Sequence, residues 1–99
     1  MMAHYTHHRY CSQVANHRVK TFSGGMKRRL SVALSFLGDP HVIFLDEPTT
    51  GMDPKIRRDV WNLILRMKQD RVMIMTTHSM EEADILGDNI AIMANGQLK

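Results

Sequence analysis

The sequence predicts an α/β fold in which parallel strands alternate with helices, and two observations carry this prediction. Continuous apolar runs rich in β-favouring residues occupy positions 42–45 and 72–75, as is typical of strands buried on both faces of a parallel sheet. Segments with apolar residues at helical spacing precede the first run and separate it from the second. Because ligands bind beyond the C-terminal strand ends in such sheets, the residues that follow each run form the candidate site.

Length and composition agree with one globular domain at most. The chain has 99 residues, of which 43% are hydrophobic and 23% charged, and this usage differs from that of disordered, collagen-like or coiled-coil chains. Its apolar runs are far shorter than the ~20 residues that a membrane-spanning helix needs. A single cysteine, Cys11, excludes an internal disulfide framework.

Positive charge is concentrated in the first part of the chain. No acidic residue precedes Asp39, whereas six Lys and Arg residues do, and acidic residues outnumber basic ones in the remainder. The cluster Lys27-Arg28-Arg29 could contact nucleic acid, phosphate or an anionic membrane surface. A solvated helix face is the commoner meaning of such a run, and we favour it.

Residues 1–20 are predicted to be a disordered or foreign tail, because they lack apolar periodicity and hold four of the six histidines. The tail contains metal-competent side chains at short spacing, namely His4, His7, His8 and Cys11. A metal site there is the alternative to a plain polar tail, but the sequence offers no second cluster to support it.

The first helix is predicted to begin just after residues 23–25 and to end at Gly38-Asp39-Pro40. Its apolar residues at helical spacing are Leu30, Ala33, Leu34 and Leu37. The strand at 42–45 follows and delivers Asp46 and Glu47 at its C-terminal end.

The second helix is predicted from Asp53, which is placed to cap it, with Pro54 at the first helical position. Its expected buried stripe comprises Ile56, Val60, Leu63, Ile64 and Met67. After the strand at 72–75 and His78, a capping box of Ser79 and Glu82 predicts another helix. Residues 90–93 and the Asn95-Gly96 pair predict a third strand that enters a tight hairpin.

Three groups of residues could carry chemistry. Asp46 and Glu47 offer one carboxylate to hold Mg²⁺, usually through water, and one to orient or deprotonate an attacking water. Taken alone, the pair is equally compatible with a strand that ends in polar residues. Residues 23–25 form either an anion site at a helix start or an ordinary N-cap, and His78 by itself suits a structural role.

Taken together and in this order, the segments resemble the C-terminal half of the nucleotide-binding domain of ABC transporters, over residues 21–99. Phe22-Ser23-Gly24-Gly25-Met26 is similar to the ABC signature motif, and residues 42–46 are similar to the Walker B strand. Thr50-Gly51-Met52-Asp53 is similar to the D-loop. Residues 26–31 and 77–84 are most similar to the A subfamily, whose characterised members move lipids.

The resemblance implies a division of roles across a dimer of nucleotide-binding domains. Ser23, Gly24 and Gly25 would bind the γ-phosphate of ATP held mainly by the opposite domain. Asp46 would organise Mg²⁺, Glu47 would activate water as the catalytic base, and His78 would contact the γ-phosphate and steady that water. Asp53 would communicate between the two composite sites. The assembled protein would use ATP and Mg²⁺ to drive membrane transport, with lipid as the implied substrate. It would act at the cytoplasmic side of the membrane, with a second nucleotide-binding domain and a transmembrane domain as partners.

The sequence contains no G-x-x-x-x-G-K-[ST] motif, whose backbone amides and lysine cradle phosphates. We therefore expect a partial P-loop NTPase domain without its P-loop half, a fragment or truncated product that is inactive alone. The competing hypothesis is a non-catalytic interaction module, which contributes its signature surface to a partner's ATP or binds nucleic acid through its basic first part. The segment around His78 looks transporter-like, so nucleic acid is the less expected partner.

Overall fold

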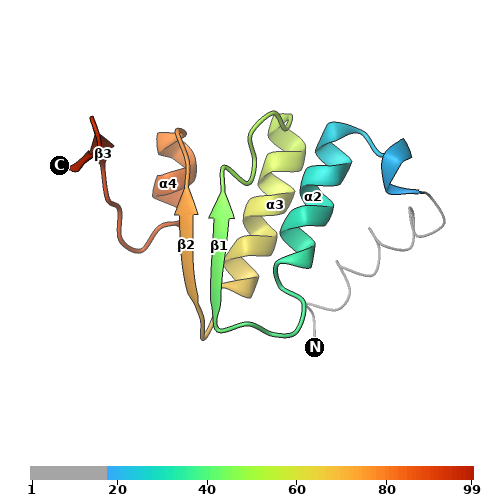
Figure 1. Cartoon of the computed structure of the whole chain (residues 1–99), viewed down its shortest axis with the longest axis horizontal. Helices are drawn as coiled ribbons and strands as arrows, with labels where there is room; N and C mark the ends of the chain where they lie inside the picture. Colours follow the sequence, from blue (N-terminus) through green and yellow to red (C-terminus); the bar gives the residue numbers. More distant parts are fainter. Residues whose placement is uncertain (1–17) are drawn as a thin grey trace.

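The computed structural model describes residues 18–99 and has the α/β architecture that the sequence predicts. A short 3-10 helix η1 (Val19–Thr21) precedes helix α2 (Gly24–Leu34), strand β1 (Val42–Asp46) and helix α3 (Pro54–Met67). Strand β2 (Val72–Thr76) and helix α4 (Met80–Leu86) follow (Figure 1). A hairpin of β3 (Met93–Ala94) and β4 (Gln97–Leu98) ends the chain. The tail's proposed metal ligands, His4, His7, His8 and Cys11, lie outside the described residues.

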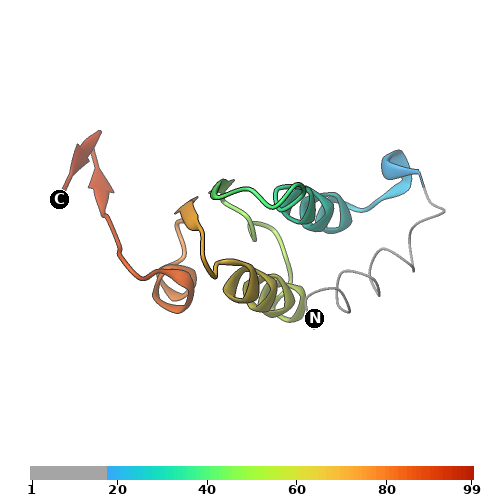
Figure 2. The same cartoon turned by 90° about the horizontal axis from the view of Figure 1, so that it is seen from below.

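Strands β1 and β2 pair in parallel, as predicted, with Val42 opposite Val72 and Asp46 opposite Thr76. Helices α3 and α4 lie on the same side of this sheet (Figure 2). Ile43 and Leu45 of β1 point into the core on that side, where they join Val32 and Phe36 from α2 and its following turn. The core therefore unites both strands with the three helices.

The expectation that both faces of the strands are buried is wrong for one face. Side chains alternate across a strand, so every second residue of β1 and β2 points away from the helices. Four apolar residues on this face are at least half exposed, with Phe44 at 71%, and we call them the open sheet face: Val42, Phe44, Val72 and Ile74. None of the described elements covers it, because all three long helices contribute to the core on the other side.

Helix α2 starts earlier and ends earlier than predicted. Gly24 and Gly25 are its first two residues, and it stops at Leu34 rather than near Gly38. The buried residues of this segment are Val32, Ala33 and Phe36, whereas Leu34 and Leu37 are exposed. The predicted stripe is therefore rotated, because Phe36, which lies in the turn after the helix, is the residue that enters the core.

Helices α3 and α4 agree closely with the helices that the sequence predicts. Val60 and Ile64 of the predicted α3 stripe are buried, and Ile56, Leu63 and Met67 pack against the same core. Only 5% of Trp61 is exposed, because it lies against Glu82 of α4.

The third strand differs from the prediction. The Asn95-Gly96 turn is present, with both residues at positive φ as a tight hairpin requires. Only Met93 and Ala94 form the incoming strand, however, and they pair with Gln97 and Leu98 instead of joining β1 and β2. Figure 1 shows this hairpin standing apart from the two-stranded sheet.

The C-terminal ends of β1 and β2 and the N-terminal ends of α2, α3 and α4 all lie along one edge of the molecule (Figure 1). We call it the C-terminal sheet edge. In the described part of the chain, no helix is long and apolar enough to cross a membrane.

Candidate functional site

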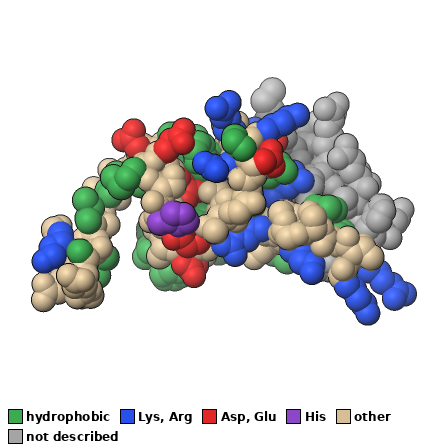
Figure 3. Space-filling model, turned by 90° about the horizontal axis from the view of Figure 1, so that it is seen from above, with side chains coloured by type: hydrophobic (Ala, Val, Ile, Leu, Met, Phe, Trp, Pro, Cys, Tyr) green, Lys and Arg blue, Asp and Glu red, His purple; other side chains and the backbone are tan. Residues whose placement is uncertain are grey.

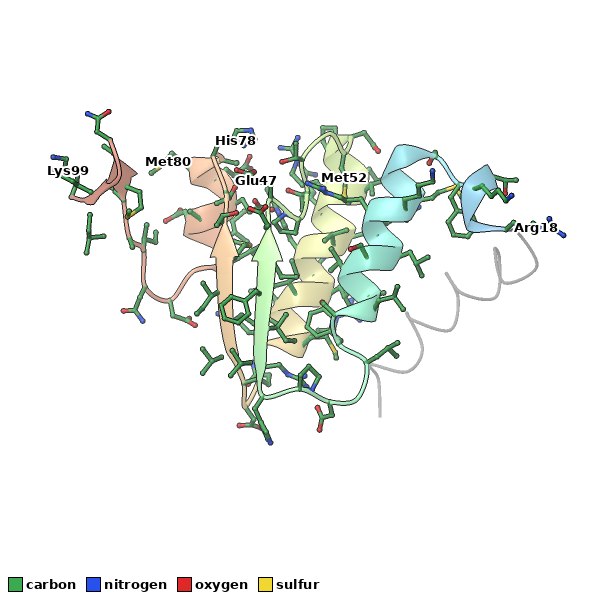
Figure 4. The ribbon with its side chains drawn as sticks, in the orientation of Figure 1. Arg18, Glu47, Met52, His78, Met80 and Lys99 are labelled. Atoms are coloured by element: carbon green, nitrogen blue, oxygen red, sulfur yellow. The ribbon has the colours of Figure 1, made fainter. Side chains whose placement is uncertain are left out.

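The predicted carboxylates and the predicted histidine meet at the C-terminal sheet edge. Asp46 is the last residue of β1 and Glu47 follows it, while His78 lies two residues beyond the end of β2. Because the two strands are parallel and in register, their ends bring residues about 30 positions apart in sequence to one place. Figure 4 shows Glu47 and His78 close to each other at this edge.

The backbone of Glu47 adopts an unusual conformation. Its φ is +47°, in the left-handed region that non-glycine residues seldom occupy. Its N–H donates both to the carbonyl and to the hydroxyl oxygen of Thr76, each at 3.1 Å. Its carbonyl oxygen accepts from Arg28 Nη2 at 2.5 Å and from the Thr50 N–H at 3.3 Å. These bonds hold a conformation that costs on the order of 1–3 kcal/mol when it is unsupported.

The carboxylate of Glu47 is held through one oxygen. Oε2 accepts a hydrogen bond of 3.0 Å from the Thr50 hydroxyl and lies 2.9 Å from Nδ1 of His78. Since an ionised carboxylate only accepts, Nδ1–H is the donor in this contact, and Nε2 is left as the other hydrogen-bonding atom of the ring. The arrangement fixes the direction of the carboxylate and leaves Oε1 available to another group.

Asp46 lies beside this pair and accepts a hydrogen bond from the Thr76 hydroxyl through Oδ1. Among residues 18–99, no three His, Cys, Asp or Glu side chains gather closely enough to hold a metal ion by themselves. Mg²⁺ commonly takes one or two protein carboxylates and fills its other positions with water and substrate phosphates. The exposed carboxylate of Asp46 fits an ion that arrives with a phosphate ligand.

The signature-like residues lie at the same edge, at the start of α2. Ser23 is the N-cap, and its hydroxyl oxygen accepts from the Met26 N–H at 3.2 Å. Ser23 is therefore an ordinary N-cap, which is one of the two alternatives for residues 23–25. Because its oxygen accepts in this bond, the hydroxyl can still donate a hydrogen bond to a second group. Gly24 and Gly25 are the first two residues of α2, so their N–H groups have no partner within the helix. A Cβ atom added at either position would meet nothing within 4 Å.

Asp53 occupies the N-cap position of α3 but makes no capping hydrogen bond with its side chain. The prediction that it caps this helix is correct for the backbone position and wrong for the side chain. Pro54 provides the helix start, and the exposed Asp53 carboxylate remains available to another partner.

Several residues of the site were not singled out from the sequence. Arg28 belongs to the basic cluster that we interpreted as a solvated helix face, yet it is half-buried and reaches the backbone of Glu47. Thr50 and Thr76 supply hydroxyls to Glu47 and Asp46. The one available signal was the hydroxyl residue Thr76, which directly follows the apolar run at 72–75.

Charge is distributed unevenly over this edge. Figure 3 looks down on it and shows a histidine among acidic side chains, with Lys and Arg side chains gathered over the other half. Lys27 is exposed, whereas Arg28 and Arg29 are half-buried. The Lys27-Arg28-Arg29 cluster is therefore not one continuous exposed patch of the kind that binds nucleic acid backbones.

Comparison with known proteins identifies the family of the chain. A family model described as "AAA domain, putative AbiEii toxin, Type IV TA system" matches residues 15–84. The chain therefore belongs to this family of AAA-type ATPase domains. Similarity to named transporters defines the family more narrowly. The chain belongs to the A subfamily of ABC transporter nucleotide-binding domains.

Three relatives illustrate that similarity. The chain is 65% identical to ABC transporter A family member 2 of Arabidopsis thaliana over 82 residues, 83% of this chain. It is 54% identical over 84% of its length to the retinal-specific phospholipid-transporting ATPase ABCA4 of Homo sapiens. It is 57% identical over 82% of its length to ATP-binding cassette sub-family A member 2 of Rattus norvegicus. The matched regions are only 8%, 4% and 3% of these relatives.

Proposed function

We propose that this chain supplies the catalytic carboxylates and the signature surface of an ABC-type ATPase site, which binds and hydrolyses ATP to drive membrane transport. The observation that carries the proposal is the Glu47 carboxylate, held through Oε2 between Thr50 and His78 with Asp46 beside it. Phosphoryl transfer depends on positioning and on charge stabilisation, and this arrangement provides a fixed base at the sheet edge.

Glu47 is the proposed general base. With Oε2 engaged by two donors, Oε1 is the atom that accepts a proton from the attacking water. His78 has a double role, because Nδ1 orients Glu47 while Nε2 can contact the γ-phosphate or the water. Asp46 is the residue that would hold Mg²⁺, which when bound neutralises charge on the phosphate oxygens.

The signature residues are proposed to act on a second nucleotide-binding domain. The Ser23 hydroxyl and the N–H groups of Gly24 and Gly25 lie at the N-terminus of α2, where an anion is favoured. We assign them to the γ-phosphate of ATP held mainly by the opposite domain. Asp53, which makes no capping bond, is assigned to communication between the two composite sites.

The transported substrate and the membrane location are inferred from the relatives. One of them is named a phospholipid-transporting ATPase, and all three named above belong to the A family of ABC transporters. We assign lipid as the transported class, a transmembrane domain as partner and the cytoplasmic side of the membrane as the location.

A chimera tests the catalytic assignment. In the Arabidopsis ABC transporter A family member 2, the 82 matched residues are replaced with those of this chain, so that the rest of a transporter of this family is present. We expect Mg²⁺-dependent ATP hydrolysis by the chimera. Glu47→Gln should retain ATP binding while slowing hydrolysis by ~10²- to 10⁴-fold, as is typical of losing a general base.

Glu81→Gln is the matched control, because Glu81 is exposed on α4 and its loss removes the same charge. It should leave the rate of hydrolysis unchanged. An equal rate for Glu47→Gln and the unsubstituted chimera would mean that Glu47 is only the polar end of β1.

A further inference from the structure

Glu82 lies outside the proposed catalytic set, yet it is the most deeply buried charged side chain in residues 18–99. Only 1% of it is exposed. Its Oε1 accepts two hydrogen bonds, one of 2.5 Å from the Thr49 hydroxyl and one of 2.8 Å from Nε1 of Trp61. A buried carboxyl is costly unless it is hydrogen-bonded, so these two contacts account for its position.

A capping box explains only part of this arrangement. The Ser79 hydroxyl accepts from the Glu82 N–H at 3.3 Å, as the sequence predicts. The reciprocal half is missing, because the N–H of Ser79 donates to the Thr77 hydroxyl at 3.0 Å. The Glu82 side chain turns away from the start of α4 and reaches the loop after β1 and the middle of α3.

Thr50 and His78, which contact the Glu47 carboxylate, are each connected to Glu82 through a neighbouring residue. Thr50, which donates to Glu47 Oε2, is bonded in sequence to Thr49, whose hydroxyl donates to Glu82. On the other side, His78 contacts the same oxygen of Glu47 and is followed by Ser79, which binds the Glu82 N–H. Hydrogen bonds and peptide bonds therefore connect Glu47 with Glu82 along two routes, one through residues 49–50 and one through residues 78–79. We call this ring of contacts the circuit.

We propose that Glu82 is a positioning residue for the catalytic base: it fixes the loop that carries Thr50 against the segment that carries His78. This inference rests on the proposed function of Glu47. Glu82 does not itself approach the reacting atoms, because it is buried below the edge between α3 and α4. Its carboxyl oxygen binds the loop after β1 at Thr49, and the two segments also meet where Glu47 contacts Thr50 and His78.

Two variants probe the circuit at different points. Thr49→Val removes one donor to Glu82 while keeping the shape of a buried side chain. Glu82→Leu removes the acceptor and leaves the Thr49 hydroxyl and the Trp61 indole N–H without it. Glu82→Gln keeps an oxygen acceptor at the same place and is the conservative rescue, whereas Glu81→Gln on the exposed side of α4 is the matched control.

The first measurement uses the full 99-residue chain and nuclear magnetic resonance. Trp61 is the sole tryptophan, so its indole N–H gives one signal, and the ring signals of His78 are identified by their loss in His78→Ala. We expect Thr49→Val and Glu82→Leu to shift both the Trp61 and the His78 signals. Glu82→Gln should leave the His78 signals near their original positions, and Glu81→Gln should leave both sets in place.

The second measurement uses ATP hydrolysis by the chimera. Misplacement of a catalytic group lowers turnover more than it lowers substrate affinity, so Thr49→Val should reduce kcat by about 10- to 100-fold with KM nearly unchanged. Glu82→Gln should retain most of the activity that Glu82→Leu loses.

The outcomes separate this inference from the proposed function. If the unsubstituted chimera fails to hydrolyse ATP, the proposed function is wrong, and the magnetic resonance signals still decide whether Glu82 couples the loops. If Trp61 responds to Thr49→Val while His78 and kcat do not, Glu82 only stabilises local packing and the inference is overturned. If Glu82→Leu prevents folding, Thr49→Val alone gives the decision.

Discussion

Arg28 of helix α2 donates a hydrogen bond of 2.5 Å from Nη2 to the main-chain carbonyl oxygen of Glu47, 19 residues away. The bond joins the helix that begins with the signature-like residues to the proposed catalytic base. It also supports Glu47 in its left-handed backbone conformation. A single hydrogen bond therefore connects α2, which carries the signature-like residues, to the backbone of Glu47.

Arg28→Met is predicted to destabilise the chain. The variant keeps much of the apolar stem but removes a charged donor from a half-buried carbonyl oxygen, a loss worth about 1.5–3 kcal/mol. Urea unfolding followed by Trp61 fluorescence measures the effect. Lys27→Met is the control, because Lys27 is exposed and its replacement should change the free energy of unfolding by less than about 0.5 kcal/mol.

Gly25→Asp is predicted to separate folding from function. A side chain at this position meets nothing within 4 Å, and a carboxylate in the first turn of α2 is favourable to the helix, so the free energy of unfolding should not fall. The same negative charge should repel a phosphate at the helix start. In the chimera, ATP-driven association of nucleotide-binding domains, followed by crosslinking, should be lost.

Ser31→Asp controls for the added charge, since Ser31 is exposed on α2 well beyond its first turn. It should leave association intact. Normal association of the Gly25→Asp chimera with ATP would show that the assignment of the signature residues is wrong.

The open sheet face is predicted to make the 99-residue chain associate with itself. Phe44 is 71% exposed in the middle of this face, and among residues 18–99 each of β1 and β2 has a strand neighbour on one side only. Phe44→Thr keeps a β-favouring residue while removing a large apolar surface, so it should increase the monomer fraction in analytical ultracentrifugation. A sharply cooperative, monomeric unfolding transition of the unsubstituted chain would contradict this prediction.

Gly87→Ala is predicted to destabilise the end of α4. A Cβ atom at this position would lie 2.7 Å from the main-chain oxygen of Ala83, which cannot move without distorting the helix. Overpacking of this kind costs about 1–3 kcal/mol, which thermal unfolding would detect as a lowered Tm. Gly24→Ala should not have this effect, because its added Cβ enters open space at the start of α2.

The sequence by itself determined the order and type of the main elements. The two apolar runs predicted β1 and β2, which are present. Pro54 and the spacing of Val60 and Ile64 predicted α3, and Ser79 is the N-cap of α4 as expected. These features depend on neighbouring residues and on periodicity, which a single sequence displays directly. The parallel strands also placed Glu47 and His78 at one edge, and their contact is present.

Only the tertiary structure decided which polar side chains pair across the fold. Glu82 binds Thr49, 33 residues away, and Trp61, 21 residues away, although its local spacing indicated only a capping residue. Likewise, Arg28 had the pattern of a solvated helix face and instead reaches Glu47. Such contacts depend on how α2, α3 and α4 pack on the sheet, and that packing also left Phe44 exposed where an apolar run alone predicts burial.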